Sequence, residues 1–463
     1  MQLVDLVLKN GKIATSSGIF EAGIAIDGEK IVAIAKDDAL PKADLTIDMK
    51  HNVALPGIID SHVHVCTPEG IRETFETGTK AAAAGGVTTI IEMPSLWSRL
   101  TTTMKNLQWK KQTGEKQAFV DFALYGGEIQ DEKDLNEIED LIKAGVVGFK
   151  ITMGGRTAIK DDATLMKALQ KISKMDSTAS FHAENNSLLK YFKTKLMDEG
   201  RNDLEAHADS RPPLIEVEAI SRAILYSKIS DSKIHICHLT TKEGVKLVER
   251  AKRKGIKITS ETCPHFLFFT REDYSQYGPS IITNPPLRSK HDVEALWNGL
   301  AKGTVDIIVT DHCAYSKKEK EIGWTDVWKT PVGIPGLETL VCLLLSEGVN
   351  KKRITLERFV QISSETPAKI FGLYPKKGTI RVGSDADITI IDLKKENVIS
   401  GDKLQCVADY TPFEGWKVRG WPILSLVRGK IVMENGEIKG RSGFGKFIPS
   451  RQPIFPFANN VSN

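Results

Sequence analysis

Two histidines one residue apart close an apolar run in the stretch LPGIIDSHVHV, residues 55–65. Side chains on a β-strand alternate between its faces, so His62 and His64 are expected to project from the same face. Two neighbouring imidazoles make a good pair of metal ligands. A lone pair of this kind is explained equally well by one histidine packed in the core and the other facing solvent. The rest of the chain must therefore decide between the two interpretations.

Further polar residues follow later apolar runs, and these are Lys150, His182, His238, His265, Asp311 and His312. The chain has only 10 histidines, so their concentration after such runs favours a metal site. Four imidazoles and a carboxylate exceed the three protein ligands that a catalytic zinc typically takes. Two metals are the economical interpretation, because a hydroxide bridging two metals suits the hydrolysis of an unactivated amide.

Lys150 is the unusual member of this set. A lysine among metal ligands repels the cations unless it is neutral, paired with an acid or chemically modified, and burial lowers a lysine's pKa and makes its amine nucleophilic. From chemistry alone, the favoured interpretation is an ammonium group that reaches solvent or an acidic neighbour.

The elements that would position these residues alternate regularly through the middle of the chain. About eight short β-branched or apolar runs alternate with amphipathic segments over about 260 residues, which is the length and rhythm of a (β/α)8 barrel. Chemistry in such a barrel lies at the carboxyl ends of the strands. A doubly wound open sheet is the alternative, but the chain lacks a GxGxxG turn and its candidate ligands follow many strands.

The two ends of the chain have a different texture. Short alternating runs surround turn dipeptides at Asn10-Gly11, Asp27-Gly28 and Asn435-Gly436, which predicts antiparallel strands. We therefore expect a discontinuous β domain from residues 1–54 and 370–463, with the barrel at residues 55–369.

Composition narrows the classes of protein to consider. With 463 residues, 41% of them hydrophobic and 26% charged, the chain is typical of a folded globular protein. A net charge of +4 gives no case for nucleic acid or an anionic membrane as a partner. No apolar run approaches the roughly 20 residues of a membrane helix, and six scattered cysteines fit reduced thiols, so a cytoplasmic protein is expected.

Several segments, taken in order, resemble one enzyme family: GIIDSHVHV, GFKITMG, HAEN, HICHLTTKEGV, TCPHFL, NPPLRS, TDH and GSDADITIIDL. They are similar to the cyclic amidohydrolases, which include allantoinase, hydantoinase/dihydropyrimidinase and dihydroorotase. The resemblance covers nearly the whole chain. It implies a (β/α)8 barrel with a small β-sandwich from both termini, and hydrolysis of a cyclic amide or ureide, a small-molecule substrate.

The resemblance also implies roles for individual residues. Lys150 would be carboxylated by CO2, and its carbamate would bridge two divalent metals, usually zinc. His62, His64 and Asp311 would complete the first metal site, and His182 and His238 the second. Asp311 would act as the general base for a metal-bridging hydroxide, and the protein would form a homotetramer or a homodimer.

Neighbouring residues are expected to support this set. His265 and His312 lie outside the six ligands, and each would either orient a ligand or simply pack beside the site. Glu184 and Asn185, which follow His182, are expected to fix loop and ligand geometry rather than perform chemistry.

The choice of ring depends on departures from each subfamily's pattern. Dihydroorotases carry an arginine and an asparagine where this chain has Cys66 and Ser95, which makes a carboxylate-bearing substrate unlikely. Hydantoinases place a tyrosine where this chain has Gly155, although the C-terminal part, with KIFGLYPKKGTIRVG and DYTPFEGW, is hydantoinase-like.

The segments HVCTPEGIRETFETGTKAAAAGGVTTIIEMP and SRPPLIEVEAISRAI most resemble allantoinase, with a departure at Pro68-Glu69-Gly70. The expected substrate contacts, which suit a compact polar ring, are Met153, Gly155, Asn284 and Gly333. We therefore expect hydrolysis of allantoin to allantoate, with hydantoinase/dihydropyrimidinase as the alternative. Dihydroorotase and a non-catalytic dihydropyrimidinase-like scaffold are less favoured, the latter because all six ligand positions are filled.

Overall fold

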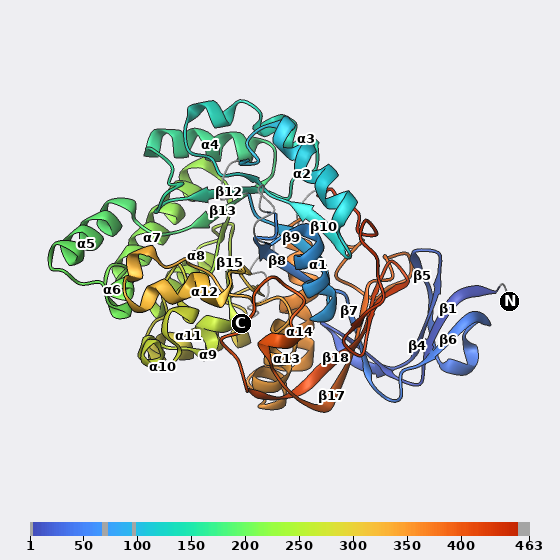
Figure 1. Ribbon diagram of the computed structural model, residues 1–463. Coiled ribbons are helices and arrows are strands. Elements are labelled where there is room, and N and C mark those ends of the chain that lie inside the picture. Colours follow the sequence, from blue (N-terminus) through green and yellow to red (C-terminus); the bar gives the residue numbers. More distant parts are fainter. Residues whose placement is uncertain (1–2, 67–72, 95–98, 452–463) are drawn as a thin grey trace.

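The computed structural model describes residues 3–66, 73–94 and 99–451 (Figure 1). The departures from family patterns at Pro68-Glu69-Gly70 and Ser95 lie outside the described residues.

Parallel strands form a closed barrel in the middle of the chain, which confirms the predicted fold class. Neighbouring strands pair in parallel in chain order. The barrel closes where Val63 pairs with His312 and where the backbone N–H of Val147 donates to the carbonyl of Leu124 over 3.0 Å. The strands are β8 (Ile58–Val63), β9 (Val87–Glu92), β10 (Asp121–Leu124) continued by β11 (Gly126–Gly127), β12 (Phe149–Thr152), β13 (Thr178–His182), β14 (Lys233–Ile236), β15 (Ile258–Thr262) and β16 (Ile307–Ile308).

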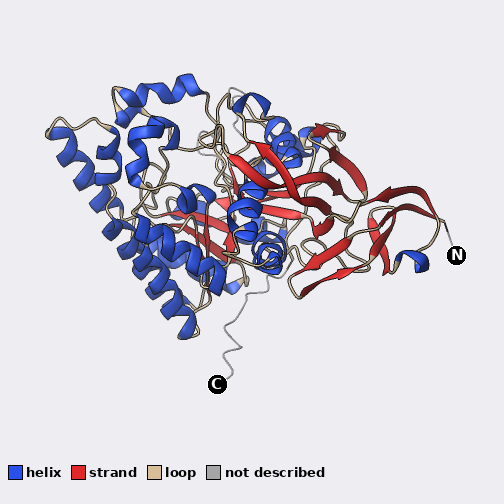
Figure 2. Ribbon diagram, turned by 90° about the horizontal axis from the view of Figure 1, so that it is seen from below, coloured by secondary structure: helices blue, strands red, loops and turns tan. Residues whose placement is uncertain are grey.

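Helices connect these strands and surround them (Figure 2). Helix α8 shows why the segments fold this way, because the Thr241 side chain caps its first turn and Val245, Val248 and Ala251 are buried at helical spacing. No helix in the described chain is long and apolar enough to cross a membrane. The helices are α1 (Phe75–Ala84), α2 (Met104–Gln117), α3 (Ile138–Lys143), α4 (Asp162–Lys174), α5 (Asn186–Asp198), α6 (Leu204–Asp209), α7 (Pro213–Ser230), α8 (Lys242–Arg253), α9 (Pro264–Phe268), α10 (Tyr274–Tyr277), α11 (Lys290–Lys302), α12 (Lys317–Lys320), α13 (Leu340–Leu343), α14 (Leu356–Val360) and α15 (Thr366–Ile370).

Strands from both ends of the chain form a β-sandwich beside the barrel. One sheet has the order β5-β4-β1-β6, and the other has the order β20-β19-β18-β17-β7-β2-β3. Apolar side chains of both sheets share one core, to which Leu8 and Ile24 contribute from one sheet and Ile388 and Leu426 from the other. The strands are β1 (Val4–Lys9), β2 (Lys12–Thr15), β3 (Gly18–Glu21), β4 (Gly23–Asp27), β5 (Lys30–Ala35), β6 (Ala43–Asp48), β7 (Val53–Pro56), β17 (Ile388–Val398), β18 (Lys417–Val427), β19 (Lys430–Glu434) and β20 (Glu437–Ile438).

The strands place two segments differently from the expected domain boundaries. Residues 53–56 form β7, which pairs with β17 in the sandwich, so the first barrel strand begins at Ile58. Near the C-terminus, Lys446 and Ile448 pair with Phe122 of β10 rather than with the sandwich. The backbone groups of Phe122 are available because pairing between β10 and the following segment begins only at Leu124.

A buried ion cluster joins the two parts of the molecule. The ammonium of Lys377 lies 2.5 Å from Asp121 of β10 and 2.6 Å from Asp387, which precedes sandwich strand β17. Asp385 lies 3.0 Å from the same nitrogen, and Lys377 is fully buried. The cluster therefore ties the amino end of a barrel strand to the sandwich. Elsewhere, all six cysteines are free thiols, as expected.

Candidate metal centre and substrate pocket

The six residues singled out as metal ligands come together at one end of the barrel. Five lie at or just after the carboxyl end of a strand: His62 and His64 at β8, His182 at β13, His238 after β14 and Asp311 after β16. Lys150 lies within β12, two residues before its end. All six line one pocket. Parallel strands of a closed barrel present their carboxyl ends on the same side, so residues separated by some 250 positions become neighbours.

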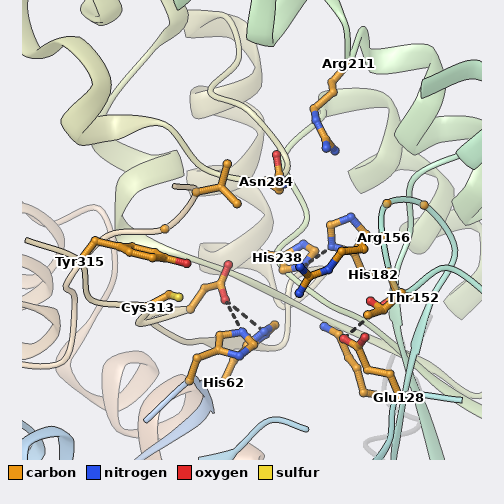
Figure 3. A pocket seen from close by; sticks show the side chains of 18 residues that line it. His62, Glu128, Thr152, Arg156, His182, Arg211, His238, Asn284, Cys313 and Tyr315 are labelled. Carbon is orange, nitrogen blue, oxygen red and sulfur yellow. Dashed lines mark hydrogen bonds and ion pairs between the residues drawn. The ribbon is translucent and has the colours of Figure 1, made fainter. Parts of the chain in front are cut away.

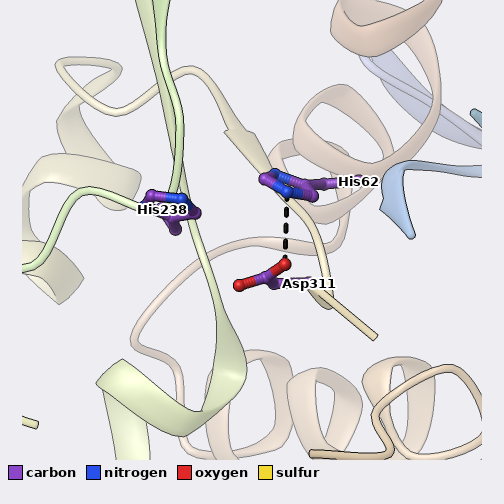
Figure 4. Close-up of side chains that lie close together, drawn as sticks. All are labelled: His62, His238 and Asp311. Carbon is purple, nitrogen blue, oxygen red and sulfur yellow. Dashed lines mark ion pairs between the residues drawn. The ribbon is translucent and has the colours of Figure 1, made fainter. Parts of the chain in front are cut away.

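Distances between donor atoms show two clusters. Asp311 Oδ1 lies 3.2 Å from His62 Nε2 and 3.3 Å from His64 Nε2. His182 Nδ1 lies 3.0 Å from His238 Nε2. One donor atom each from His62, His238 and Asp311 lie within 4.8 Å of one another, which links the two clusters (Figure 4).

The chemistry of this donor set fits divalent metal ions. Burial lowers the pKa values of His62 and His238, so both imidazoles are neutral and able to bind a cation. Burial opposes ionisation of Asp311, but His62 and His64 lower its pKa to about 2, and the carboxylate is charged. Within the described chain, the buried atoms Lys150 Nζ and His238 Nδ1 have no hydrogen-bond partner. Unsatisfied buried nitrogens beside an ionised carboxylate are an arrangement that fits a bound cation.

Lys150 is only 3% exposed, so its ammonium does not reach solvent. Burial lowers its pKa, but acidic neighbours that include Cys237 and Glu261 raise it by more, and the net shift is upward. This direction favours the alternative in which the ammonium meets acidic neighbours over the one in which burial makes the amine neutral.

Glu261, in β15, is a part of the centre that the sequence analysis did not identify. Its carboxylate accepts hydrogen bonds from His62 Nδ1 and from His235 Nε2, the latter over 2.9 Å, and from the backbone N–H of His238 over 3.3 Å. The contact with Nδ1 leaves Nε2 of His62 facing Asp311. The available signal in the sequence was a glutamate within the strand-like run IKITSETCPH, where a charged side chain needs a partner.

Glu184 has the equivalent place beside His182. Its carboxylate lies 2.7 Å from His182 Nε2 and pairs with Arg211. Burial opposes ionisation, but Arg211 and His182 lower the pKa of Glu184 to about 2. Asn185 accepts a hydrogen bond from the backbone N–H of Leu188 and caps α5. Both contacts fix local geometry, in line with the roles expected for these two residues.

His265 and His312 are not among the residues that line the pocket. His312 Nδ1 accepts a hydrogen bond from the backbone N–H of Gly336, and its Nε2 lies 3.0 Å from Glu73. His265 packs against the ring of Phe266, and burial lowers its pKa to about 4. The contacts of His312 therefore connect it to Gly336 and Glu73, and the ring contact of His265 is with its neighbour Phe266.

The pocket above the centre has a volume of about 260 Å³, which suits a small ring. Three of the expected substrate contacts, Gly155, Asn284 and Gly333, line it. Met153 does not, and its side chain is buried elsewhere. The reason is strand alternation: Lys150 and Thr152 face the pocket, so Met153 is out of phase with them.

Several lining residues were not anticipated from the sequence, and Figure 3 shows them around the centre: Glu128, Thr152, Arg156, Arg211, Cys313 and Tyr315. Thr152 is the last residue of β12, and the others come from loops that follow barrel strands. The positions of the loop residues depend on how those loops fold over the strand ends, which no motif in the sequence shows.

The chain is therefore a (β/α)8-barrel protein with a cluster of histidines and an aspartate, suited to binding metal ions, at the carboxyl ends of its strands. A model of the Amidohydrolase family matches residues 53–432, and the chain belongs to this family. An L-hydantoinase of Paenarthrobacter aurescens is 38% identical over 97% of this chain and 99% of that protein.

An allantoinase of Bacillus licheniformis is 33% identical over 96% of this chain and 99% of that protein. Among solved structures, an L-hydantoinase (dihydropyrimidinase) from Arthrobacter aurescens superposes with a TM-score of 0.93 and 37% identity, covering 96% of this chain and 100% of that chain.

Proposed function

We propose that this protein hydrolyses the ring amide bond of cyclic ureides of the hydantoin or dihydropyrimidine type. The observation that carries the proposal is the convergence of four imidazoles, the ionised Asp311 and the buried, unpartnered amine of Lys150 in one pocket. Membership of the Amidohydrolase family and likeness to hydantoinases over nearly the whole chain support it. A non-catalytic scaffold is disfavoured because every donor position is filled.

We infer that the site holds two divalent ions, with zinc as the proposed metal. His62, His64 and Asp311 would hold one ion, and His182 and His238 the other. A carbamate formed from CO2 on Lys150 would bridge the two, since bound cations repel an ammonium and so favour the neutral amine that reacts with CO2. When bound, the ions would polarise the ring carbonyl and acidify water.

The protein's own residues have separate tasks in this proposal. Asp311 is ionised and faces the pocket, so it can take the proton of the attacking water and pass it to the leaving ring nitrogen. Glu261 and Glu184 hold the imidazoles of His62 and His182 in orientation. Asn284 Oδ1 is buried beside the pocket without a partner in the described chain, so it can accept a hydrogen bond from a ring N–H.

The expectation that allantoin is the preferred ring is replaced by the hydantoin or dihydropyrimidine assignment. The identity to the L-hydantoinase, 38%, exceeds that to the allantoinase, 33%, over similar lengths. The hydantoinase-like C-terminal segments agree with this order. Dihydroorotate is less favoured because the position of the carboxylate-binding arginine holds Cys66, a buried thiol.

Turnover of four rings in parallel tests the proposal. Protein loaded with zinc in bicarbonate buffer is assayed on hydantoin, dihydrouracil, allantoin and dihydroorotate, beside chelator-treated protein and Asp311→Asn. We expect metal-dependent turnover, highest on hydantoin or dihydrouracil and nearly absent in Asp311→Asn. Preference for allantoin would overturn the ring assignment. Absence of turnover on all four rings, with metal bound, would overturn the proposed function.

A dimer or tetramer of the chain is also proposed, on the family resemblance described above. Light scattering of the purified protein tests this, and a mass of one chain would contradict it.

A further inference from the structure

We propose that Glu128 is a specificity residue that binds N–H groups on the substituent of the substrate ring. The inference rests on the proposed function and adds the class of ring that the pocket accepts. Such substituents include the ureido group and the alkylammonium group, which share the ability to donate hydrogen bonds to a carboxylate.

The carboxylate of Glu128 is buried but only half satisfied. Glu128 is 3% exposed and lines the pocket. Its Oε1 accepts a hydrogen bond from the hydroxyl of Thr152 over 3.2 Å, whereas its Oε2 has no hydrogen-bond partner within the described chain. A buried carboxylate oxygen left unpaired is costly, so the pocket is arranged to receive a donor there.

The strands place this carboxylate above the metal donors. Gly127 pairs with Lys150, and Thr152 lies two residues beyond Lys150 on the same face of β12. Two residues along a strand span about 6–7 Å, so the Thr152 hydroxyl and its partner lie one step nearer the pocket mouth than Lys150. A ring whose amide bond reaches the six metal-donor residues would therefore extend its substituent toward Glu128.

Charge is distributed unevenly around the pocket. Figure 3 shows Arg211 on the opposite side of the site from Glu128. Arg211 is paired with Glu184, and Lys150 and Arg156 also line the pocket. Glu128 differs from Glu184 in its unpaired Oε2: an alkyl or aryl substituent would bury this oxygen without a partner, whereas an N–H donor would satisfy it.

The test compares four hydantoins that differ only at the substituent: none, propyl, aminopropyl and ureido. Both kcat/KM and equilibrium binding by calorimetry are measured for wild type, Glu128→Gln, Glu128→Leu and Thr152→Val, with metal content determined for each. Glu132→Gln is the matched control, because Glu132 is exposed on the same loop and pairs with Lys167 outside the pocket.

In the wild type we expect a preference for the aminopropyl or ureido ring over the propyl ring. The ureido ring is allantoin, so its turnover should exceed that of the propyl ring and stay below that of unsubstituted hydantoin. Glu128→Leu should reduce that preference about 10- to 100-fold, the effect of losing a charge-assisted hydrogen bond. Thr152→Val should reduce it less, because the carboxylate remains but is no longer held. Whether the aminopropyl or the ureido ring is more affected identifies the donor, a cation or a neutral amide.

Failure of this inference is distinguishable from failure of the proposed function. Turnover in the wild type with an unchanged preference in Glu128→Leu overturns the role of Glu128 and leaves the function standing. No turnover, with donor-dependent binding that Glu128→Leu abolishes, overturns the function and supports the role of Glu128. Absence of binding by every ring overturns both, and an equal loss on all rings together with metal loss shows that Glu128 supports the metal centre instead.

Discussion

The contacts of Glu261 lead to a graded prediction for metal affinity. Its Oε1 accepts hydrogen bonds from His62 Nδ1 and from the backbone N–H of His238, and its Oε2 accepts one from His235 Nε2. In Glu261→Gln, the amide oxygen can still accept from His62 while the NH2 group faces His235. His235 can adapt by changing tautomer, because its Nδ1 lies 2.8 Å from the hydroxyl of Thr259 and can donate to it.

Loss of an orienting partner of a metal-bound histidine typically costs 10- to 100-fold in metal affinity, or about 1.4–2.8 kcal/mol. Glu261→Gln keeps one acceptor for His62 and loses only the charge, so we expect about a tenfold loss. Glu261→Leu removes every contact and should approach a hundredfold loss. Turnover at saturating zinc should recover further in the glutamine variant than in the leucine variant.

Competition with a chromophoric zinc chelator measures these affinities, and metal content after gel filtration checks them. Asp306→Asn is the matched control, because Asp306 is a buried carboxylate that pairs with Lys252 at 2.7 Å and precedes β16, away from the pocket. Unchanged affinity in both Glu261 variants would refute the orienting role. Equal losses in both would show that the charge of Glu261, rather than its hydrogen bonds, supports metal binding.

Three further variants test other parts of the molecule. Lys150→Ala should lose most bound metal, measured by atomic emission, with partial recovery in short carboxylic acids; full metal content without them would contradict the carbamate. Lys377→Met leaves the buried Asp387 without its cation, while Asp121 keeps Arg428 and Asp385 keeps Lys30 and Lys376, and it should destabilise the fold by about 3–5 kcal/mol in denaturant unfolding. Burial lowers the pKa of Lys320 from 10.5 to about 7, so the folded state releases its proton before the unfolded chain does, and stability should rise between pH 7 and pH 10.5 by up to about 1.4 kcal/mol per pH unit. Lys320→Met should lack that rise; an equal slope in wild type and variant would show that the three carbonyls contacting Lys320 hold it charged.

The barrel and the positions of the six donors could be predicted because they depend on local regularities. The spacing of His62 and His64 follows from strand periodicity, and Lys150, His182 and Asp311 each end an apolar run. Once a parallel barrel is inferred, all strand ends must meet on one side, and the donors meet with them. Their grouping in one pocket therefore needed no knowledge of side-chain packing.

The supporting residues could not be predicted because their roles depend on distant parts of the chain. Glu261 contacts His62 across 199 positions, and Lys446 pairs with Phe122 across an even larger separation. The misplaced contact, Met153, shows the complementary error: its neighbours were correctly located, but the phase of a short strand was not. Because side chains alternate along a strand, moving by one residue turns the side chain from the pocket to the barrel exterior.

The pocket combines metal donors on the strands with lining residues in the loops, and this explains why the family is easier to recognise than the substrate. The donors lie on or next to the strands, where backbone pairing fixes their positions and where any change removes a ligand. Glu128, Asn284 and Gly333 lie in loops beyond the strand ends, where substitutions alter the pocket wall without disturbing the metal donors. Motifs at strand ends therefore identify the chemistry, whereas the ring that undergoes it is selected by individual loop side chains. The unsatisfied oxygens of Glu128 and Asn284 are the positions at which this pocket can accept hydrogen bonds from the N–H groups of a substrate.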